Sequence, residues 1–237
     1  MGFESFLHGL VNPESICGIV VVIILIISRV LISKNRKCRE QLADMSYARL
    51  SGLTSLSDAD CENMDVNDPE LQERILDGIE VAKTYMDERD EYNGQKLKRL
   101  DPGDAKCVKV YKLAKPGLRL DNTDAYRLMG DVYYRGAHFG DDRIDKDYGR
   151  AWYYYNKAYE KDDLIAMFRV GVMYYKGQSV MRDRKKGLEL IRKASKLGSP
   201  DAKDWLHWRQ AMVLLVIIIL SSIVFTKIMD TYILGNL

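Results

Sequence analysis

The chain has 237 residues, with 36 Lys and Arg against 34 Asp and Glu, so its formal net charge at pH 7 is only +2. This balance provides no overall field to attract nucleic acid, and the length leaves room for one ordinary domain beside two membrane spans. The four cysteines show no C-x-x-C or framework spacing, which is typical of reduced thiols in a reducing compartment.

An apolar run at residues 16–33 has the length that a membrane-spanning helix requires, roughly 20 residues. Residues 1–15 contain no Lys or Arg, whereas four basic residues follow Ser33. A cleaved signal peptide would carry its positive charge before the apolar core. The asymmetry therefore predicts a first transmembrane helix, with residues 1–15 outside and the following residues in the cytoplasm.

The four basic residues after this run have two possible roles. They either bind anionic lipid headgroups or only set the orientation of the span. Cys38 lies among them, and a plain thiol is favoured there over an acylated one. The basic residues are Lys34, Arg36, Lys37 and Arg39.

Residues 34–68 are expected to form a juxtamembrane helix followed by a linker, because residues 51–67 are rich in Ser, Asp, Gly and Asn. A helix pair is predicted for 69–117. Its first helix starts at the capping Asp68 with Pro69 in the first helical position and ends at Asn93-Gly94. Its second helix runs from Asp104 to Ala114 and stops at Pro116-Gly117.

Residues 118–209 contain a pattern, A-x-x-x-[MV]-G-x-x-Y-Y-x-G, that occurs twice, beginning at Ala125 and at Ala166. It predicts first helices at 124–135 and 164–176, and second helices at 148–160 and 184–197. Such recurrence is typical of stacked units that cannot bury their apolar faces alone, so it predicts a solenoid. Cys107, Tyr111 and Ala114 match second-helix positions, which makes 69–115 a degenerate first unit.

A second apolar run occupies residues 210–229, and residues 230–237 follow it on the outer side. No helix breaker occurs from Asp201 to Met229, so one helix about 40 Å long is expected to pass from the last repeat into the membrane. Basic residues precede this run, which again places the middle of the chain in the cytoplasm. Trp205 and Trp208 belong either to an interfacial aromatic belt or to the core of the last repeat.

The repeated pattern resembles the Sel-one-like repeat, a relative of the tetratricopeptide repeat. The residues that carry the resemblance are Ala125, Met129, Gly130, Tyr133, Gly136, Ala151, Tyr155 and Ala158 in one unit, and Ala166, Val170, Gly171, Tyr174, Gly177, Ala194 and Gly198 in the next. The resemblance implies an all-α fold: about two full helix-pair units, with partial units at each end, between two transmembrane helices. It also implies a protein-binding scaffold without catalysis.

No catalytic, cofactor or metal constellation emerges from the sequence. His8, His138 and His207 are isolated, and no phosphate-binding or dinucleotide motif is present. The acidic loop 140–147 lacks the Gly and the final Glu of a calcium-binding loop, so a solvated insertion is favoured over an ion site. We therefore expect no enzyme, no cofactor and no nucleic-acid partner.

A partner-binding surface is predicted on the first helices of the repeats. Tyr133 and Tyr174 are consensus packing positions and are expected in the core. The tyrosines one step round each helix should face elsewhere, and with neighbouring charged and aromatic residues they are expected to form a concave binding surface. The predicted surface comprises Arg127, Asp131, Tyr134, Phe168, Arg169 and Tyr175.

These features favour a membrane-anchored scaffold that presents a cytoplasmic repeat domain to a protein partner, either for recruitment or as a subunit of a membrane complex. One alternative is a channel-like or transporter-accessory component whose spans form oligomers, although the spans contain few polar residues. A second alternative, an immunity or adaptor protein of a secretion or toxin system, rests on analogy alone.

Overall fold

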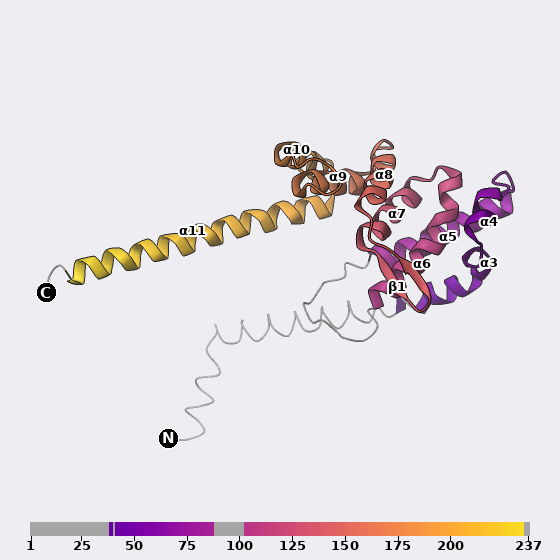
Figure 1. Cartoon of the computed structure of the whole chain (residues 1–237), viewed down its shortest axis with the longest axis horizontal. Coiled ribbons are helices and arrows are strands. Elements are labelled where there is room, and N and C mark those ends of the chain that lie inside the picture. The colour runs from indigo at the N-terminus through magenta and orange to yellow at the C-terminus, as the bar shows by residue number, and fades with distance from the viewer. Residues whose placement is uncertain (1–37, 40, 88–101, 235–237) are drawn as a thin grey trace, which may run out of the picture.

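The computed structural model describes residues 38, 39, 41–87 and 102–234 (Figure 1). The first apolar run, Lys34, Arg36, Lys37 and the predicted helix end at Asn93-Gly94 lie outside these residues. Within the described part, helices stack beside one another from α3 to α10, and α11 leaves the stack as a long rod.

Residues 51–67 fold into two short helices, α3 (Ser51–Thr54) and α4 (Asp58–Asn63), so the linker predicted there is wrong. Leu53 and Cys61 are buried and anchor the two helices to the rest of the domain. Ser57 begins α4 with a capping box, in which its hydroxyl accepts from the Asp60 N–H at 3.2 Å and its own N–H donates to the Asp60 carboxylate. Although this segment is rich in polar residues, the burial of Leu53 and Cys61 and the cap at Ser57 stabilise its two helices.

The predicted helix pair forms as α5 (Pro69–Asp87) and α6 (Pro102–Ala114). Asp68 caps α5 as expected, because its carboxylate accepts from the Glu70 N–H at 3.0 Å. Helical structure was predicted to end at Pro116-Gly117, but after α6 it continues through these residues as a 3₁₀ helix, η1 (Lys115–Leu120). Gly117 permits this path, since a Cβ there would lie 2.5 Å from the Ile79 side chain.

The two repeats form close to their predicted bounds, as α7 (Thr123–Arg135) with α8 (Tyr148–Tyr159) and α9 (Leu164–Lys176) with α10 (Arg184–Lys196). Each helix begins at a side chain that accepts hydrogen bonds from first-turn N–H groups. These caps are Asn122, Asp147, Asp163 and Asp183. Local sequence therefore fixes where every repeat helix starts.

A two-stranded antiparallel hairpin, β1 (Ala137–Phe139) with β2 (Asp142–Ile144), connects α7 to α8. The all-α prediction is wrong at this point, although the fold is otherwise helical. Gly140 turns the chain with a φ of 62°. Ala137 and Ile144 pack against Cys107 and Val108 of α6, and these apolar contacts hold the hairpin on the helix.

The helices of each repeat approach so closely that glycine is required at the contact. A Cβ at Gly130 of α7 would lie 2.5 Å from the Tyr155 ring of α8. In the second repeat the contact is with backbone atoms, because a Cβ at Gly187 would meet the Gly171 carbonyl oxygen at 2.6 Å and the Tyr175 nitrogen at 2.7 Å. Gly187 replaces the alanine at the same position of the first repeat, Ala151, and this allows backbone to pack on backbone.

We expect Gly187→Ala to destabilise the protein by about 1–3 kcal/mol, because the added methyl group meets backbone atoms that cannot rotate away. The measurement is chemical denaturation followed by circular dichroism. Gly52→Ala is the matched control, since its Cβ would meet only the flexible end of Arg74, at 3.0 Å. Equal midpoints for Gly187→Ala and the parent chain would contradict the packing described here.

The last helix, α11 (Pro200–Leu234), is continuous for 35 residues, as the absence of a breaker predicted. Its first turns belong to the repeats: Ala202 is buried, and Trp205 packs edge-on against Tyr175 with ring centroids 5.2 Å apart. Trp208 is 72% exposed, so only one of the two tryptophans joins the core of the last repeat.

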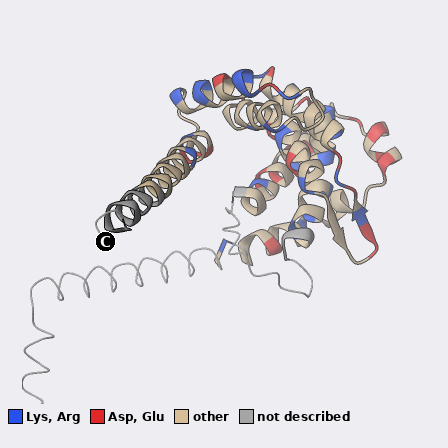
Figure 2. Cartoon of the chain, turned by 60° about the vertical axis from the view of Figure 1, so that its left-hand side comes forward, with Lys and Arg blue, Asp and Glu red and all other residues tan. Residues whose placement is uncertain are grey.

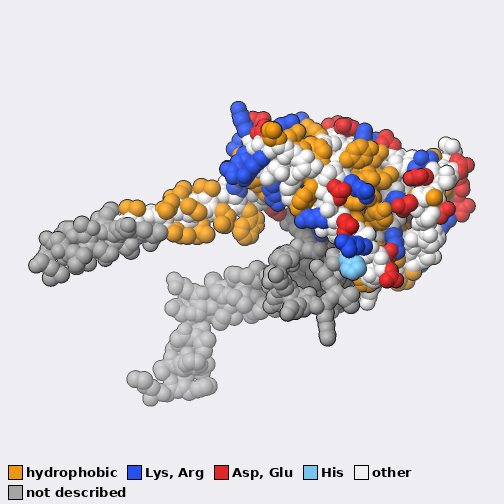
Figure 3. Space-filling view, in the orientation of Figure 1, with side chains coloured by type: hydrophobic (Ala, Val, Ile, Leu, Met, Phe, Trp, Pro, Cys, Tyr) orange, Lys and Arg blue, Asp and Glu red, His pale blue; other side chains and the backbone are white. Residues whose placement is uncertain are grey.

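Beyond these turns, large apolar side chains from Met212 to Leu220 are exposed around α11. Within the described residues, α11 is the one helix long and apolar enough to cross a membrane. Its stretch Pro200–Ser221 has a mean hydropathy of 1.3, and its apolar window has no buried residue. Figure 3 shows this part of α11 projecting from the domain as an apolar rod.

Candidate functional site

The two repeats carry equivalent niches where the first helix ends and the second begins. In the first repeat, Arg150 of α8 lies over the Tyr133 ring at 5.3 Å and donates to the Tyr133 hydroxyl at 3.3 Å. In the second, Lys186 of α10 lies over the Tyr174 ring at 4.1 Å and donates to its hydroxyl at 2.7 Å. A tyrosine paired with a cation from the second helix is therefore repeated in the two units.

An aromatic ring from the preceding helix completes each niche. Tyr111 of α6 meets Tyr133 edge-on with centroids 6.3 Å apart, and Trp152 of α8 meets Tyr174 edge-on at 5.0 Å. Tyr133 is buried as predicted, whereas Tyr174 is only half-buried. Both niches thus join neighbouring units, which explains why tyrosine is used where phenylalanine would leave the cation without a hydroxyl acceptor.

A groove of 430 Å³ opens over the first niche, between α6, the hairpin and the start of α8. Its charges lie in pairs: Lys112 donates to Asp142 at 2.8 Å, and Arg143 donates to Asp145 at 2.7 Å. Asp147 also pairs with Arg150 at 3.5 Å, so three acids of the loop 140–147 are engaged by cations. Between residues 41–87 and 102–234, no group of three or more His, Cys, Asp or Glu side chains is placed to hold a metal.

The equivalent groove over the second niche has a volume of 640 Å³ and a more basic lining. Arg182, Arg184 and Lys186 line it with a single acid, Asp183, and the neighbouring Met181 is 91% exposed. Helix α8 connects the two grooves, because its Arg150 lines the first and its Trp152 packs on Tyr174, which lines the second. Together they offer a partner paired aromatic and charged groups on one edge of the domain.

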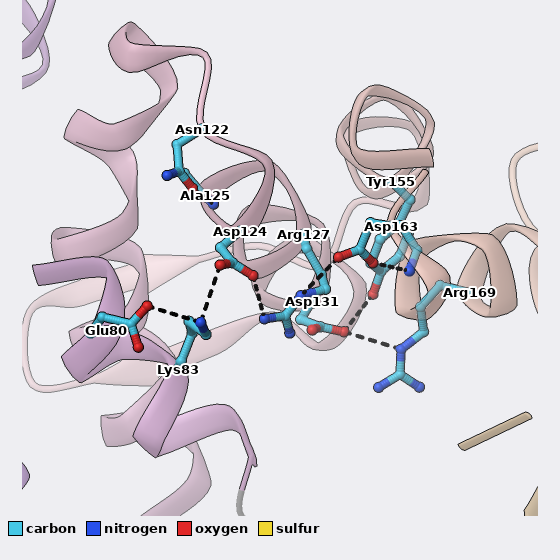
Figure 4. A network of polar contacts seen from close by, with 11 residues as sticks. Glu80, Lys83, Asn122, Asp124, Ala125, Arg127, Asp131, Tyr155, Asp163 and Arg169 are labelled. Carbon is cyan, nitrogen blue, oxygen red and sulfur yellow. Dashed lines mark hydrogen bonds and ion pairs between the residues drawn. The ribbon is translucent and has the colours of Figure 1, made fainter. Parts of the chain in front are cut away.

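Buried charges form a second polar feature, which crosses the first helices of successive units (Figure 4). Lys83 of α5 pairs with Glu80 at 2.9 Å and with Asp124 of α7 at 3.2 Å. Asp124 also pairs with Arg127 at 2.9 Å, and Arg127 reaches the α9 cap Asp163 at 3.7 Å. This alternation of charge links three helical units through the interior.

Asp131 of α7 lies at the centre of the network. It is 4% exposed, accepts from the buried Tyr155 hydroxyl at 2.7 Å and pairs with Arg169 of α9 at 3.3 Å. Burial is the largest single influence and by itself would lower the pKa of Arg127 and of Arg169. The carboxylate of Asp131, together with the other acidic groups around each guanidinium, outweighs burial and raises both pKa values. Burial also raises the pKa of Tyr155, so its hydroxyl stays a donor at ordinary pH.

This network corrects the predicted concave surface. Arg127, Asp131 and Phe168 are buried, with exposed fractions of 4%, 4% and 5%, so the expectation that they are exposed is wrong. Arg169 is partly buried in the network. Tyr134 and Tyr175 are half-buried in contacts with other aromatic rings of the chain. Their binding of a partner stays a prediction.

The predicted headgroup-binding residues fall at the start of the described chain. Arg39 is exposed on a helix beside the exposed Cys38, whereas Lys34, Arg36 and Lys37 lie outside the described residues. Sequence reasoning missed the cations Arg150 and Lys186. They occupy equivalent positions three residues after the capping Asp147 and Asp183, and comparison of the two units would have revealed them.

Tyr111 of α6 and Tyr126 of α7 are expected to make the stability of the fold depend on pH. Burial raises the pKa of Tyr111 to about 12, and burial together with a hydrogen bond to Asp121 raises the pKa of Tyr126 to about 12. Both groups therefore favour the folded state below pH 10, and this stabilisation is lost as the pH rises from 10 to 12. We expect unfolding in that window, followed by tyrosinate absorbance and circular dichroism.

Replacing both residues, as Tyr111→Phe with Tyr126→Phe, should make the fold less sensitive between pH 10 and 12. An unchanged alkaline transition in that variant would show that these phenols do not cause it. Tyr153→Phe is the control, since the Tyr153 ring is 56% exposed.

The architecture that these elements define is a tandem helix-pair solenoid. The family model of the Sel1 repeat matches residues 123–163 and 164–199, which correspond to α7 with α8 and α9 with α10. The two matches fall on the units that carry the resemblance, and the matched residues do not include α5 and α6. No curated protein sequence matches the chain significantly.

Among solved structures, the chain is similar to a Sel1 repeat protein from Oxalobacter formigenes, with 23% identity and a TM-score of 0.38, covering 45% of this chain and 42% of that one. It is also similar to the cysteine-rich protein B of Helicobacter pylori, with 20% identity and a TM-score of 0.37, covering 57% of this chain and 93% of that one. A third is a protective antigen of uropathogenic Escherichia coli with an SLR fold, with 19% identity and a TM-score of 0.35, covering 55% and 32%.

Proposed function

We propose that this chain is a membrane-anchored scaffold that binds a protein partner through its Sel1 repeats. Sel1 repeats are modules of protein–protein interaction. The observation that carries the membrane part is α11, which begins inside the last repeat and continues without interruption into exposed apolar residues. A rigid connection of this kind would fix the repeats at a set distance from a bilayer.

The partner surface that the geometry favours is the edge formed by the two tyrosine–cation niches. Each groove presents aromatic rings beside charged groups, a combination that is enriched at the energetic centres of protein interfaces. Because α8 contributes a residue to each niche, one extended segment of a partner that follows α8 would contact both grooves. This surface replaces the buried residues of the predicted concave face.

Partner capture from native membranes tests this surface. The variant Arg150→Glu with Lys186→Glu reverses the exposed cation in each niche and should abolish capture of the specific partner. The matched control, Arg74→Glu with Arg119→Glu, reverses two exposed cations that line neither groove and should leave capture intact. If both variants retain the same partners, the niches are not the binding surface.

We also propose that the repeats face the cytoplasm, with both termini outside. The support is the sequence charge around the two apolar runs, with Lys203 and Arg209 just before the second. Cys38 is suited to the test because it is exposed, whereas Cys61 and Cys107 are buried. In a Cys17→Ser chain, an impermeant maleimide should label Cys38 only after cells are permeabilised; labelling of intact cells would reverse the orientation.

The rival function, an oligomeric channel component, finds less support in α11. The Ser221 hydroxyl donates to the Ile218 carbonyl within its own helix at 2.8 Å, so it is not free to line a polar path. Ion flux into vesicles that contain the purified chain would favour the channel, and its absence would favour the scaffold.

A further inference from the structure

The basic side chains of the last repeat gather at the end of the domain from which α11 emerges. Figure 3 shows Lys and Arg concentrated there, and Figure 2 shows them along the helices beside the start of α11. α10 alone carries six cations and one acid, Glu189. The cations, all exposed, are Arg184, Lys185, Lys186, Arg192, Lys193 and Lys196.

Four of these cations occupy the face of α10 opposite its core, whereas Arg184 and Lys186 line the second groove. Gly187, Ile191 and Ala194 are buried against α9, which leaves the other side of the helix to solvent. Positions 185, 192 and 196 are spaced by seven and four residues, so Lys185, Arg192 and Lys196 follow one line along that side. The exposed face is therefore a cationic strip.

The strip lies close to where a bilayer would begin. α10 packs against the start of α11, and the exposed apolar residues of α11 begin near Met212. At 1.5 Å per residue, this is about 18 Å along the helix from Pro200. The headgroup layer extends about 5–8 Å beyond the hydrocarbon on each side, so the gap to α10 shrinks to about 10–13 Å. This is close to the Debye length of about 8–10 Å.

We propose that the exposed face of α10 binds the anionic headgroups of the bilayer that holds α11. This inference rests on the proposed membrane anchoring. Four cations with one acid on this face complement an anionic lipid surface, and each such cation favours contact by about fivefold. Because α11 already holds the strip at the surface, the effective lipid concentration is high and weak contacts suffice.

Lipid is favoured over a nucleic acid or an acidic protein because the strip is continuous with the anchor. A ligand from solution would have to approach the narrow space between the domain and the bilayer. Headgroups already occupy that space once α11 is inserted. The contact would also fix the tilt of the solenoid, and with it the direction in which the two niches point.

The test uses the full chain in nanodiscs of phosphatidylcholine, with or without phosphatidylserine. A fluorophore at Leu197→Cys, in a Cys17→Ser and Cys38→Ser background, reports contact through quenching by nitroxide on lipid headgroups. Leu197 is suitable because it is 54% exposed at the end of α10. Phosphatidylserine should increase quenching at least fivefold, and high salt should reverse the increase.

The variant Lys185→Glu with Arg192→Glu and Lys196→Glu should lose this response, whereas Arg143→Glu with Lys146→Glu and Lys157→Glu should keep it. Equal quenching in the two lipid mixtures, or an unchanged response in the α10 variant, would overturn the α10 proposal. Elution of the chain with the discs separately reports anchoring. Failure to elute with either disc would overturn the membrane anchor itself.

Discussion

Replacing Tyr155 by alanine is expected to lower the free energy of unfolding by about 3–5 kcal/mol. Tyr155 is fully buried and packs on Gly130, where a single Cβ would already collide with its ring. Removing the ring leaves a cavity between α7 and α8 and deprives Asp131 of its hydrogen-bond donor. Denaturant unfolding followed by tryptophan fluorescence measures the effect.

Tyr155→Phe separates the two contributions. It retains the ring and removes only the hydroxyl, so the expected loss is about 1–3 kcal/mol from the unsatisfied carboxylate. If Tyr155→Ala and Tyr155→Phe destabilise the protein equally, the ring does not fill the space between α7 and α8 as described.

Asp131→Ala is expected to destabilise the protein by about 3–5 kcal/mol, because it leaves buried positive charge without its partner. Asp131 is the ion-pair partner of Arg169 at 3.3 Å. It is also the largest of the influences that raise the pKa of Arg127 and of Arg169 against burial. The Tyr155 hydroxyl also loses its acceptor. Thermal unfolding at neutral pH measures the loss.

The matched control is Asp145→Ala, which breaks an ion pair whose partners are exposed by 72% and 77% and should leave stability nearly unchanged. Because Asp131 and Tyr155 are in contact, the double variant Asp131→Ala with Tyr155→Phe should cost less than the sum of the two. A strictly additive result would show that the hydrogen bond between them contributes nothing.

The helical repeats could be predicted because their signals are local. Caps at Asp163 and Asp183 and left-handed glycines at 136 and 177 mark the starts and ends of helices wherever they occur. The hairpin escaped prediction because three residues per strand are too few for an alternating pattern. It depends on apolar contacts with α6, which a sequence alone does not place.

The buried network escaped prediction because charged residues were expected on the surface. A signal did exist in the repeat alignment, where Arg127 and Asp131 of α7 correspond to Phe168 and Val172 of α9, which are buried. An apolar residue at the equivalent position indicates an inward-facing site. At these two equivalent positions, the first repeat buries paired charges and the second repeat buries apolar side chains.

The headgroup and orientation predictions for residues before 38 concern the part of the chain outside the described residues, so they stay predictions. The second apolar run is different, since its helix is continuous with a repeat whose packing is described. The proposed membrane-anchored function therefore depends on α11 more than on any other described element.

A spin-label scan along α11 of the full chain in lipid vesicles tests that dependence directly. Labels at exposed positions from Met212 to Leu220 should all be accessible to oxygen and protected from a water-soluble paramagnetic reagent, whereas labels at Lys203 and Asp204 should show the reverse. Access of the aqueous reagent throughout Met212 to Leu220, or protection only every third or fourth residue by packing on protein, would contradict a helix that carries the repeats into lipid.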